Sequence, residues 1–282
     1  MDYHSDRFKD FSLMIYDDTQ LVAILPANRL NDTLYSHQGL TYGGFIFRDN
    51  LTDFNIKDIF KSVFKFLGNH GVNNLELKLL PEFYHFFLSN PFSKYLTTIN
   101  VNSFRTDKVL AINFNDPLKI HKTKLKHFRK NEKKGFKIKE ESDLTLFWDK
   151  VLIPRLKEKH GVKPVHSLEE IRDLKLKFPN NIRQFNIYLD SEILAGITIF
   201  DKGEVIKSQY GATTIKGEKE RALEFLFLKL IYKFKEEGKF YFSMGTVRDL
   251  KKPLGYNESL KKHKEELGCK VYAQKFYKIS IP

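Results

Sequence analysis

Residues 205–244 read VIKSQYGATTIKGEKERALEFLFLKLIYKFKEEGKFYFSM, and this stretch decides the fold. It opens with a strand-like run that reaches Tyr210-Gly211, and a linker then leads into an amphipathic helix over residues 221–235. Glu236-Glu237-Gly238 ends the helix, and residues 239–244 read as an apolar strand. The pattern predicts a strand–helix–strand unit.

The same unit occurs a second time, near the start of the chain. There a strand run reaches Tyr42-Gly43, residues 56–67 have helical apolar spacing, Asn69-His70-Gly71 ends the helix and residues 75–79 alternate as a strand. Tyr42 and Tyr210 lie 168 residues apart, and Gly71 and Gly238 lie 167 residues apart. Two anchors at nearly the same offset predict a duplicated supersecondary unit.

The rest of the chain mixes strands and helices, which predicts an α/β (α+β) protein. One helix start is well marked, because Ser167 is a good N-cap and Glu169 and Glu170 favour the helix dipole. The expected strands are residues 11–16, 20–26, 109–114, 185–189, 194–200, 205–212 and 271–281, and the other expected helices are residues 118–134, 144–159, 167–177 and 259–267.

Composition bounds the class of protein. The chain has 282 residues, 41% of them hydrophobic and 14% aromatic, which is enough for one large or two small domains with real cores. The single Cys269 leaves no intrachain disulfide and no cysteine zinc cluster. There is no apolar run near the ~18 residues that span a bilayer, and no basic-then-apolar signal pattern. We therefore expect a cytoplasmic protein without a membrane span.

The net charge of +13 comes from two segments. Residues 116–139 sum to +8 and residues 251–282 sum to +5. Such patches attract the phosphates of nucleic acid, of a nucleotide sugar or of coenzyme A. The alternative is a solvated helix face that only aids solubility.

The order of the segments resembles a known fold family. Hairpin strands, a strand that ends in Gly, an amphipathic helix and a further strand form the core order of the GNAT acyltransferase fold. Two such halves joined by a basic helix resemble the Fem-type aminoacyltransferases and the related nucleotide-sugar N-acyltransferases. The segments that carry the resemblance are residues 36–44 (SHQGLTYGG), 128–135 (FRKNEKKG), 160–167 (HGVKPVHS), 209–212 (QYGA) and 256–268 (YNESLKKHKEELG).

The resemblance implies two tandem GNAT-like domains, each a mixed sheet flanked by helices. We place the N-terminal domain at 1–117, a basic linking helix and strand at 118–139, and the C-terminal domain at 140–282, with a last strand that can return to the N-terminal half. The resemblance also implies acyl transfer to an amine where two parallel strands splay apart. Those strands are the one that ends near Tyr210 and the one at residues 239–244.

The expected donor is acyl-CoA. In GNAT proteins its pyrophosphate binds a Gln/Arg-x-x-Gly-x-Gly/Ala turn before the main helix, but residues 213–221 here read TTIKGEKER, with one Gly and two opposing acids. Amides at a helix N-terminus still favour phosphate, so we expect donor contacts from Gly217, Lys219 and Arg221. In the Fem-type pattern Lys264 faces the donor site; the alternative is a solvated lysine in a basic helix.

Acyl transfer also needs an acid for the leaving group and a base for the amine. The hydroxyl of Tyr210 is a suitable donor to a departing thiolate; the alternative is a core aromatic. His166, fixed between Pro164 and the cap, is the expected base because an imidazole has the right pKa. His37 is a second loop histidine, and His160 a weaker third.

Further polar residues at strand ends and in loops are expected to bind the acceptor. Gln209, Ser243 and Asn257 can hydrogen-bond a sugar or nucleotide. Tyr42 lies in a Gly-rich turn where it can stack on a base, and Arg129 can hold a diphosphate. No His-x-x-x-His or His-Glu-x-x-His motif occurs, so no metal is expected.

The predicted function is N-acyl transfer from acyl-CoA to a nucleotide-linked amino sugar in surface-polysaccharide biosynthesis. One alternative is a Fem-type transferase that uses aminoacyl-tRNA and a peptidoglycan precursor; no segment is long enough for the helical arm that such enzymes often carry, which favours the sugar enzyme slightly. A third reading is a non-catalytic nucleic-acid or partner-binding module, supported by the missing Gly-rich loop.

Overall fold

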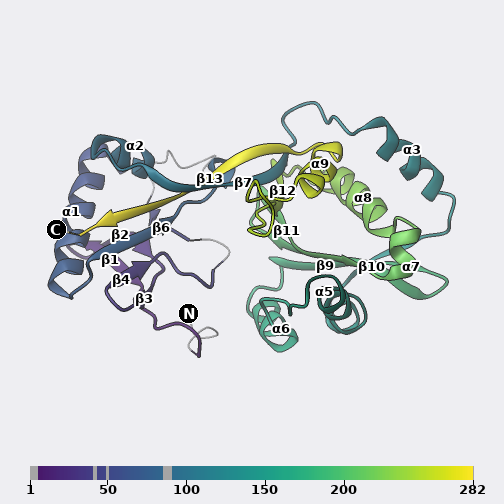
Figure 1. The fold of residues 1–282 in the computed structure, drawn as a ribbon, viewed down its shortest axis with the longest axis horizontal. Helices are drawn as coiled ribbons and strands as arrows, with labels where there is room; N and C mark the ends of the chain where they lie inside the picture. Colours follow the sequence, from purple (N-terminus) through teal and green to yellow (C-terminus); the bar gives the residue numbers. More distant parts are fainter. Residues whose placement is uncertain (1–5, 41–42, 49–50, 85–90, 282) are drawn as a thin grey trace. The chain divides into compact units, whose positions relative to one another are not determined.

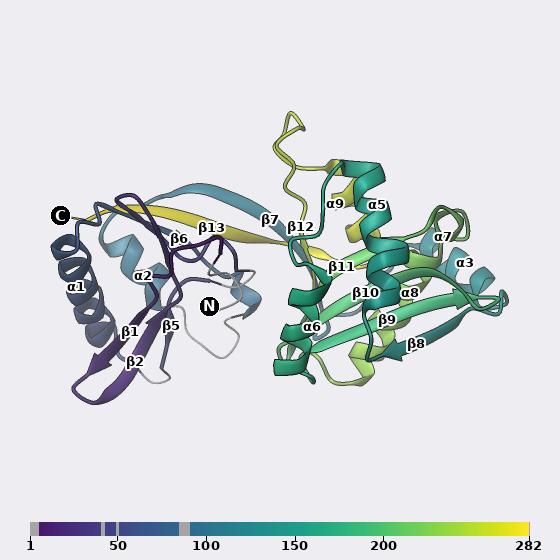
Figure 2. The ribbon, with the colours of Figure 1, turned by 90° about the horizontal axis from the view of Figure 1, so that it is seen from below.

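The computed structural model describes residues 6–40, 43–48, 51–84 and 91–281, and these form two compact units (Figures 1 and 2). One unit extends to Lys108 and takes in the chain again from Tyr272 onward, and the other is Val109–Val271. The two compact units therefore have other boundaries than the domains expected from the sequence, at residues 1–117 and 140–282. The expected boundaries refer to the two GNAT-like halves and stay a prediction.

In its described residues, the first unit contains a three-stranded sheet, four strands of a larger sheet and two α-helices. Its elements are β1 (Leu13–Asp17), β2 (Gln20–Leu25), β3 (Asn28–Leu30), β4 (Thr33–Tyr35), β5 (Ile46–Phe47), α1 (Asp53–Asn69), β6 (Asn74–Lys78), a 3-10 turn (Glu82–Tyr84) and α2 (Pro91–Thr98). The hairpin β1–β2 and the helix α1 are where the sequence predicts them. The strands β1-β2-β5 form an antiparallel sheet, and β3-β4-β6 continue into β13 (Lys270–Ser280), whose later residues pair with β6.

The second unit is a mixed sheet covered on both faces, in the order β7-β12-β11-β10-β9-β8. Its strands are β7 (Ser103–Asn113, which enters this unit at Val109), β8 (Lys137–Glu141), β9 (Ile182–Leu189), β10 (Glu192–Asp201), β11 (Val205–Thr213) and β12 (Tyr241–Thr246). Its helices are α3 (Lys122–Asn131), α4 (Thr145–Phe147), a π-helical turn (Trp148–Leu152), α5 (Ile153–His160), α6 (Leu168–Lys177), α7 (Ile215–Lys219), α8 (Ala222–Glu236) and α9 (Glu258–Glu266).

Alternation along the strands explains the two helix layers of this unit. Residues 185, 187, 195, 197 and 199 pack with the apolar stripe of α8, and Ile182, Tyr188 and Ala212 on the other face pack with the helices between β8 and β9. Figure 1 shows α3 and α8 over one face and α5 and α6 over the other. The predicted fold class, a mixed α/β sheet flanked by helices, is confirmed.

The duplicated unit is present, but its first strand is not where the sequence places it. In the second unit β11 and β12 are parallel, joined by α8; in the first unit β4 and β6 are parallel, joined by α1. The strand that pairs with β6 ends at Tyr35, so a strand end at Tyr42-Gly43 is wrong for this ladder. Residues 41 and 42 lie outside the described part of the chain.

Two other differences concern helices. The basic helix expected over residues 118–134 is shorter, because His121 caps it at Thr123 and it ends at Asn131. The single helix expected over 144–159 contains the π-helical turn, which the continuous apolar pattern concealed. Among the described residues, no helix is long and apolar enough to cross a membrane.

Candidate functional site

The parallel strands β11 and β12 separate part-way along their length. Their register runs through Val205↔Tyr241 and Ile206↔Phe242 and stops at Lys207↔Ser243. Both strands continue beyond that pair, to Thr213 and Thr246. The expected splay is therefore confirmed, and it leaves an edge of each strand without ladder pairs to the other.

A bulge on each strand produces this separation. The ladder of β11 with β10 skips Gln209, and the ladder of β12 with β7 skips Met244. Gly245 follows with φ +74°, a left-handed conformation that glycine adopts most readily. Bulges bend the strand that carries them, so the two strands turn away from each other at the same level.

His166 and Tyr210 meet beside the splay. Tyr210 lies on β11 beyond the last residue paired with β12, and its hydroxyl is 2.6 Å from Nδ1 of His166 and accepts the backbone N–H of His166 at 3.1 Å. His166 is only 3% exposed and precedes Ser167, which caps α6 in a capping box with Glu170. The cap predicted from sequence thus fixes the histidine against the tyrosine.

Trp148 supports this pair from the π-helical turn, and sequence analysis missed it. Its indole contacts the Tyr210 ring edge to face at a centroid distance of 5.0 Å. The side chain is fully buried, and its Nε1 has no hydrogen-bond partner among the described residues. Single π-helical turns recur at functional sites. The sequence does contain a signal for this turn, the adjacent apolar pairs Phe147-Trp148 and Val151-Leu152. They make the apolar face wider than the stripe of an ordinary amphipathic helix.

Lys264 fastens the diverging end of β12. From α9 its Nζ donates to the carbonyl oxygens of Met244 at 2.6 Å, Thr246 at 3.1 Å and Gly245 at 3.4 Å. Burial lowers the pKa of this ammonium to about 8. The sequence predicts that Lys264 binds the donor, and these three hydrogen bonds to backbone argue against that role. They indicate that Lys264 holds the bulged strand in place.

Comparison with known proteins bears on this geometry. No protein-family model and no curated protein matches the chain. The structure of FemX does, with a TM-score of 0.71 and 8% identity over 97% of this chain and 88% of that one. A C-terminal domain of a putative lysylphosphatidylglycerol synthetase from Agrobacterium fabrum gives 0.66 at 9% identity over 95% and 83%. A tandem GNAT protein of the clavulanic acid pathway gives 0.54 at 9% identity over 96% and 82%.

The fold is Fem-like. The expected resemblance to tandem GNAT and Fem-type proteins is confirmed at the level of fold, and identities of 8–9% carry nothing finer. The turn before α8, residues 213–221, is the site expected from the sequence for the pyrophosphate of an acyl-CoA donor.

The residues of this turn are engaged in packing. The amide of Gly217 donates to the cap Thr214 at 3.0 Å, and a Cβ on Gly217 would lie 2.2 Å from the carbonyl oxygen of Leu194. Lys219 is exposed, and Arg221 has φ +55° and gives α8 no side-chain cap. The single glycine of the turn is thus explained by close approach to β10, which argues against the expected phosphate cradle.

A carboxylate occupies the start of α8. Glu224, 9% exposed in the first turn, accepts a hydrogen bond from Lys124 of α3 at 2.6 Å, and Ala222 beside it is fully buried. His263 and Glu266 of α9 lie 3.1 and 3.4 Å from the same ammonium. The negative charge of Glu224 in the first turn therefore opposes a second anion at this helix start. This charge and the packing of Gly217 argue against the expected pyrophosphate site.

The remaining expected site residues lie partly at the splay and partly away from it. Gln209, the bulged residue, accepts from Lys207 Nζ at 2.7 Å, and Ser243 accepts from the Gly245 amide at 3.3 Å. Asn257 caps α9 through the amide of Leu260, and Arg129 is exposed on α3. Gln209 and Ser243 flank the splay, whereas Asn257 has a capping role and Arg129 lies on the solvent face.

His37 belongs to the first unit, so it is described by itself. It follows β4 with φ +42°, its ring is 2% exposed, and its Nδ1 accepts the amide of Gly39 at 3.2 Å. Tyr42 lies outside the described residues. The structure therefore brings together two of the three expected catalytic side chains, His166 and Tyr210.

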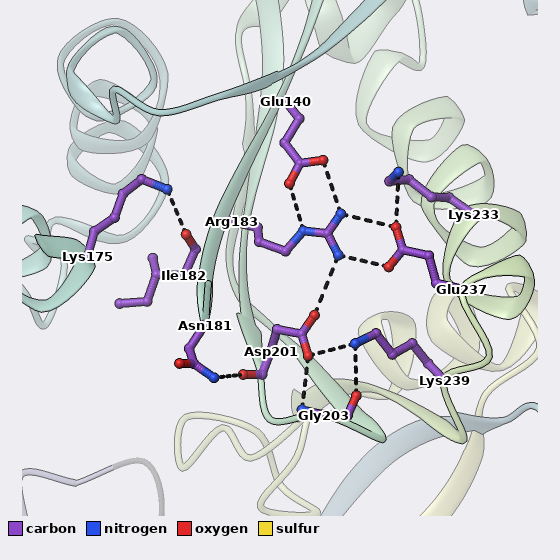
Figure 3. A network of polar contacts seen from close by, with 10 residues as sticks. All are labelled: Glu140, Lys175, Asn181, Ile182, Arg183, Asp201, Gly203, Lys233, Glu237 and Lys239. Carbon is purple, nitrogen blue, oxygen red and sulfur yellow. Dashed lines mark hydrogen bonds and ion pairs between the residues drawn. The ribbon is translucent and has the colours of Figure 1, made fainter. Parts of the chain in front are cut away.

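The end of the sheet where β11 begins has a different chemistry, shown in Figure 3. Arg183 of β9 donates to Glu140 at 2.7 and 3.0 Å and to Glu237 at 2.8 and 3.1 Å. Lys239 joins Asp201 at 2.8 Å. These paired charges link β8, β9, β10 and the end of α8, and they hold together the frame on which the splay is built.

Proposed function

We propose that this chain is an acyltransferase that moves an activated acyl group to an amine beside the splay of β11 and β12. The observation that carries the proposal is the 2.6 Å contact between Tyr210 and buried His166, next to strand edges that lack ladder pairs. A proton-transfer pair beside backbone that has left its strand ladder is an arrangement that acyl transfer can use.

Each group has a defined part in the reaction. The amine nitrogen forms a bond to the acyl carbon, and a backbone N–H group of β11 beyond its last pair with β12 stabilises the oxyanion. Tyr210 takes the proton that the amine loses, and Nδ1 of His166 accepts the phenolic proton in turn. When the bond from the acyl carbon to the leaving group breaks, Tyr210 gives its proton to the leaving atom and recovers one from His166, so both side chains return to their starting state.

The donor that we propose is an aminoacyl ester of the aminoacyl-tRNA type. Two observations support it. The buried carboxylate of Glu224 in the first turn of α8 disfavours the pyrophosphate of acyl-CoA there, and the fold neighbours include FemX and a putative lysylphosphatidylglycerol synthetase, a protein named for an aminoacyl product. The basic segment at residues 116–139 offers charge for a polyanionic donor.

The acceptor that we propose is an amine on a phosphorylated cell-surface precursor, of which a peptidoglycan precursor is the Fem-type example. Transfer from acyl-CoA to a nucleotide-linked amino sugar is the second candidate, supported by the tandem GNAT neighbour. It requires Glu224 and Lys124 to give way to a pyrophosphate. A non-catalytic RNA-binding module is the third candidate.

A thermal-shift screen separates the three, because a ligand specific for the folded state raises the melting temperature by mass action. The ligands are acetyl-CoA, UDP-amino sugars, aminoacyl-tRNA and the same tRNA deacylated. We expect a shift with aminoacyl-tRNA that exceeds the deacylated shift and no shift with acetyl-CoA. A saturable rise of the melting temperature with acetyl-CoA would favour the nucleotide-sugar N-acyltransferase. Equal rises with the charged and the deacylated tRNA would favour the RNA-binding module.

Single-turnover transfer from the donor so identified tests the dyad. His166→Ala and Tyr210→Phe should each lower the rate about 100-fold, in the range for a lost acid or base. Tyr232→Phe on α8 is the matched control, since it removes a hydroxyl from the same unit outside the splay. Wild-type rates in both dyad variants would remove the catalytic assignment.

A further inference from the structure

One side of α3 carries a row of basic side chains, which we call the α3 stripe. Its members are Lys122, Lys126, Arg129 and Lys130 within the helix and Lys133 in the turn that follows it. All five are exposed. Residues three and four apart lie on the same side of a helix, so the five cations project from one face.

The α3 stripe differs from the charged faces of the helices beside it. In α8 Lys233 binds Glu237 at 3.0 Å, and in α9 Lys261 binds Glu265 at 2.6 Å, each pair four residues apart. Helix α3 contains no acidic residue, and its lysines stand four residues from other cations. Like charges at that spacing destabilise a helix by about 0.2–0.5 kcal/mol per pair. The stripe is therefore not the mixed-charge surface that solubility alone favours.

The acids near α3 are bound to lysines outside the stripe. These ion pairs are Glu224 with Lys124, Glu220 with Lys134 and Glu132 with Lys229. The hydrogen bond from Lys134 lowers the pKa of Glu220 most, and Lys130 adds a smaller effect from farther away. Within the described part of the chain, no carboxylate lies within ion-pair distance of a stripe side chain. The positive charge of the stripe is thus left for a partner outside the chain.

The other side of α3 is covered, which limits the class of partner. Phe128 stacks on Phe225 at a centroid distance of 5.1 Å and contacts Tyr232 at 5.8 Å. No apolar side chain of α3 is exposed. A helix that binds a membrane surface needs its apolar side for the lipid. A row of cations about 16 Å long, without apolar side chains, suits the phosphates of a nucleic-acid strand better.

Helix α3 is also tied to the splay of β11 and β12, which belongs to the same unit. On its inner side Nζ of Lys124 lies 3.1 Å from Nδ1 of His263 on α9. The next residue of α9, Lys264, donates to the carbonyl of Met244 at the diverging end of β12. A polyanion on the stripe would therefore be held by a helix that packs against the one fastening the splay.

We propose that the α3 stripe binds the phosphate backbone of RNA. This inference rests on the proposed function, in which the RNA is that of the aminoacyl ester donor. Ion pairs to phosphate release counterions and do not read bases, so the affinity should fall steeply with salt and depend little on RNA sequence.

Fluorescence anisotropy of the full-length chain with labelled, deacylated tRNA tests the stripe without turnover, across about 50 to 200 mM salt. In the α3 variant, Lys122→Gln with Lys126→Gln and Lys130→Gln, we expect about tenfold weaker affinity. The slope of log affinity against log salt should fall by about 2, from the loss of three phosphate contacts. The melting temperature should not fall, because the variant removes like-charge pairs.

The matched control removes three exposed lysines at the same spacing from α1. This α1 variant, Lys57→Gln with Lys61→Gln and Lys65→Gln, should bind tRNA as the wild type does. Equal losses in the two variants would overturn the stripe, because positive charge anywhere on the chain would then suffice.

The remaining outcomes separate the stripe from the proposed function. Unchanged affinity and salt slope in the α3 variant would overturn the stripe and leave the donor proposal standing. Weaker binding in that variant, with no transfer by the wild type, would keep the stripe and reject the catalysis. No tRNA binding by the wild type would reject both. Loss of binding to phosphatidylglycerol vesicles, with tRNA binding intact, would assign the stripe to a membrane.

Discussion

The two copies of the strand–helix–strand unit share one plan and differ at the strand ends. In each copy three residue pairs join the parallel strands, from Thr33↔Asn74 in the first and from Val205↔Tyr241 in the second. Each helix is followed by a left-handed glycine, Gly71 at φ +68° and Gly238 at φ +72°. The two copies therefore share the parallel pairing and the helix end, and they differ in the residues beyond the third pair.

Beyond that pair the first copy is closed by a serine. The backbone N–H of Ser36 donates to the carbonyl of Glu76 at 2.9 Å, and its hydroxyl accepts the amide of Lys78 at 2.8 Å. Gly43 packs onto the same residue, since a Cβ there would lie 2.6 Å from the Ser36 carbonyl oxygen. In the second copy two bulges and Lys264 keep the strands apart, and Tyr210 occupies the edge.

The helix starts differ as well. Thr52 caps α1 in a capping box with Asn55 at the surface. At the start of α8 the buried Glu224 relies on Lys124 from another helix. The largest expected effect follows from this difference: Lys124→Met leaves Glu224 without its closest partner and should lower the free energy of unfolding by about 3–5 kcal/mol.

Urea unfolding measures this effect. The control in the first copy is Thr52→Ala, which removes a surface cap and should cost about 1 kcal/mol. The double variant Lys124→Met with Glu224→Leu should recover most of the loss, because no uncompensated charge remains. If Lys124→Met and Thr52→Ala lower the free energy of unfolding equally, the buried ion pair of the second copy contributes no more than the surface cap of the first.

The next effect concerns the lysine that holds β12. The pKa of Lys264 is about 8 in the folded chain against an ordinary 10.5, because burial disfavours its charged form. Between these values the unfolded chain binds more protons, so stability rises with pH. The free energy of unfolding of the wild type, relative to Lys264→Met, should rise by about 3 kcal/mol from pH 8 to 10.5.

Chemical denaturation at several pH values gives this difference. Lys262→Met removes an exposed lysine from the same helix and should show no such pH dependence relative to the wild type. A flat difference for Lys264→Met would place its ammonium in water and separate it from the carbonyls of β12.

The closed copy gives a smaller effect. Ser36→Ala removes the acceptor of the Lys78 amide and should lower the free energy of unfolding by about 1–2 kcal/mol, the cost of a buried donor left unpaired. Transfer by the second unit should keep its rate, which single-turnover kinetics can check. A large loss of rate in this variant would show that the first copy takes part in the chemistry.

Sequence reasoning reached the plan of the fold and part of the site, for physical reasons. Helix α8 and the hairpin β1–β2 follow from apolar period and turn residues, which are local signals. The sequence predicts His166 and Tyr210 as two separate candidates and does not predict that they contact each other. Their contact depends on where the α6 cap meets β11, a long-range relation that no local pattern records.

The elements missed were those without a local signature. The strands β3 to β5 are two or three residues long, too short for an alternation to be seen. The bulges at Gln209 and Met244 are visible only as a skipped partner on another strand. Gly217 was expected to be a phosphate-loop glycine because its real constraint, the Leu194 carbonyl, comes from a different strand.

The smallest effect compares the two helix ends. Both copies end with a glycine, but after α8 Glu237 also binds Arg183, which with burial opposing lowers the pKa of Glu237 to about 2 from 4.5 (Figure 3). Its contribution to stability is present above pH 4.5 and is lost as the pH falls toward 2. The full shift corresponds to ~3 kcal/mol, which solvent screening at this partly exposed group reduces to about 1 kcal/mol.

The variant Glu237→Gln should lower the free energy of unfolding by that amount at pH 7 and leave it unchanged near pH 2. The control Glu236→Gln should change it little at either pH. A Glu237 variant that is equally destabilised at both pH values would show that packing at the end of α8, and not the ion pair, distinguishes this copy.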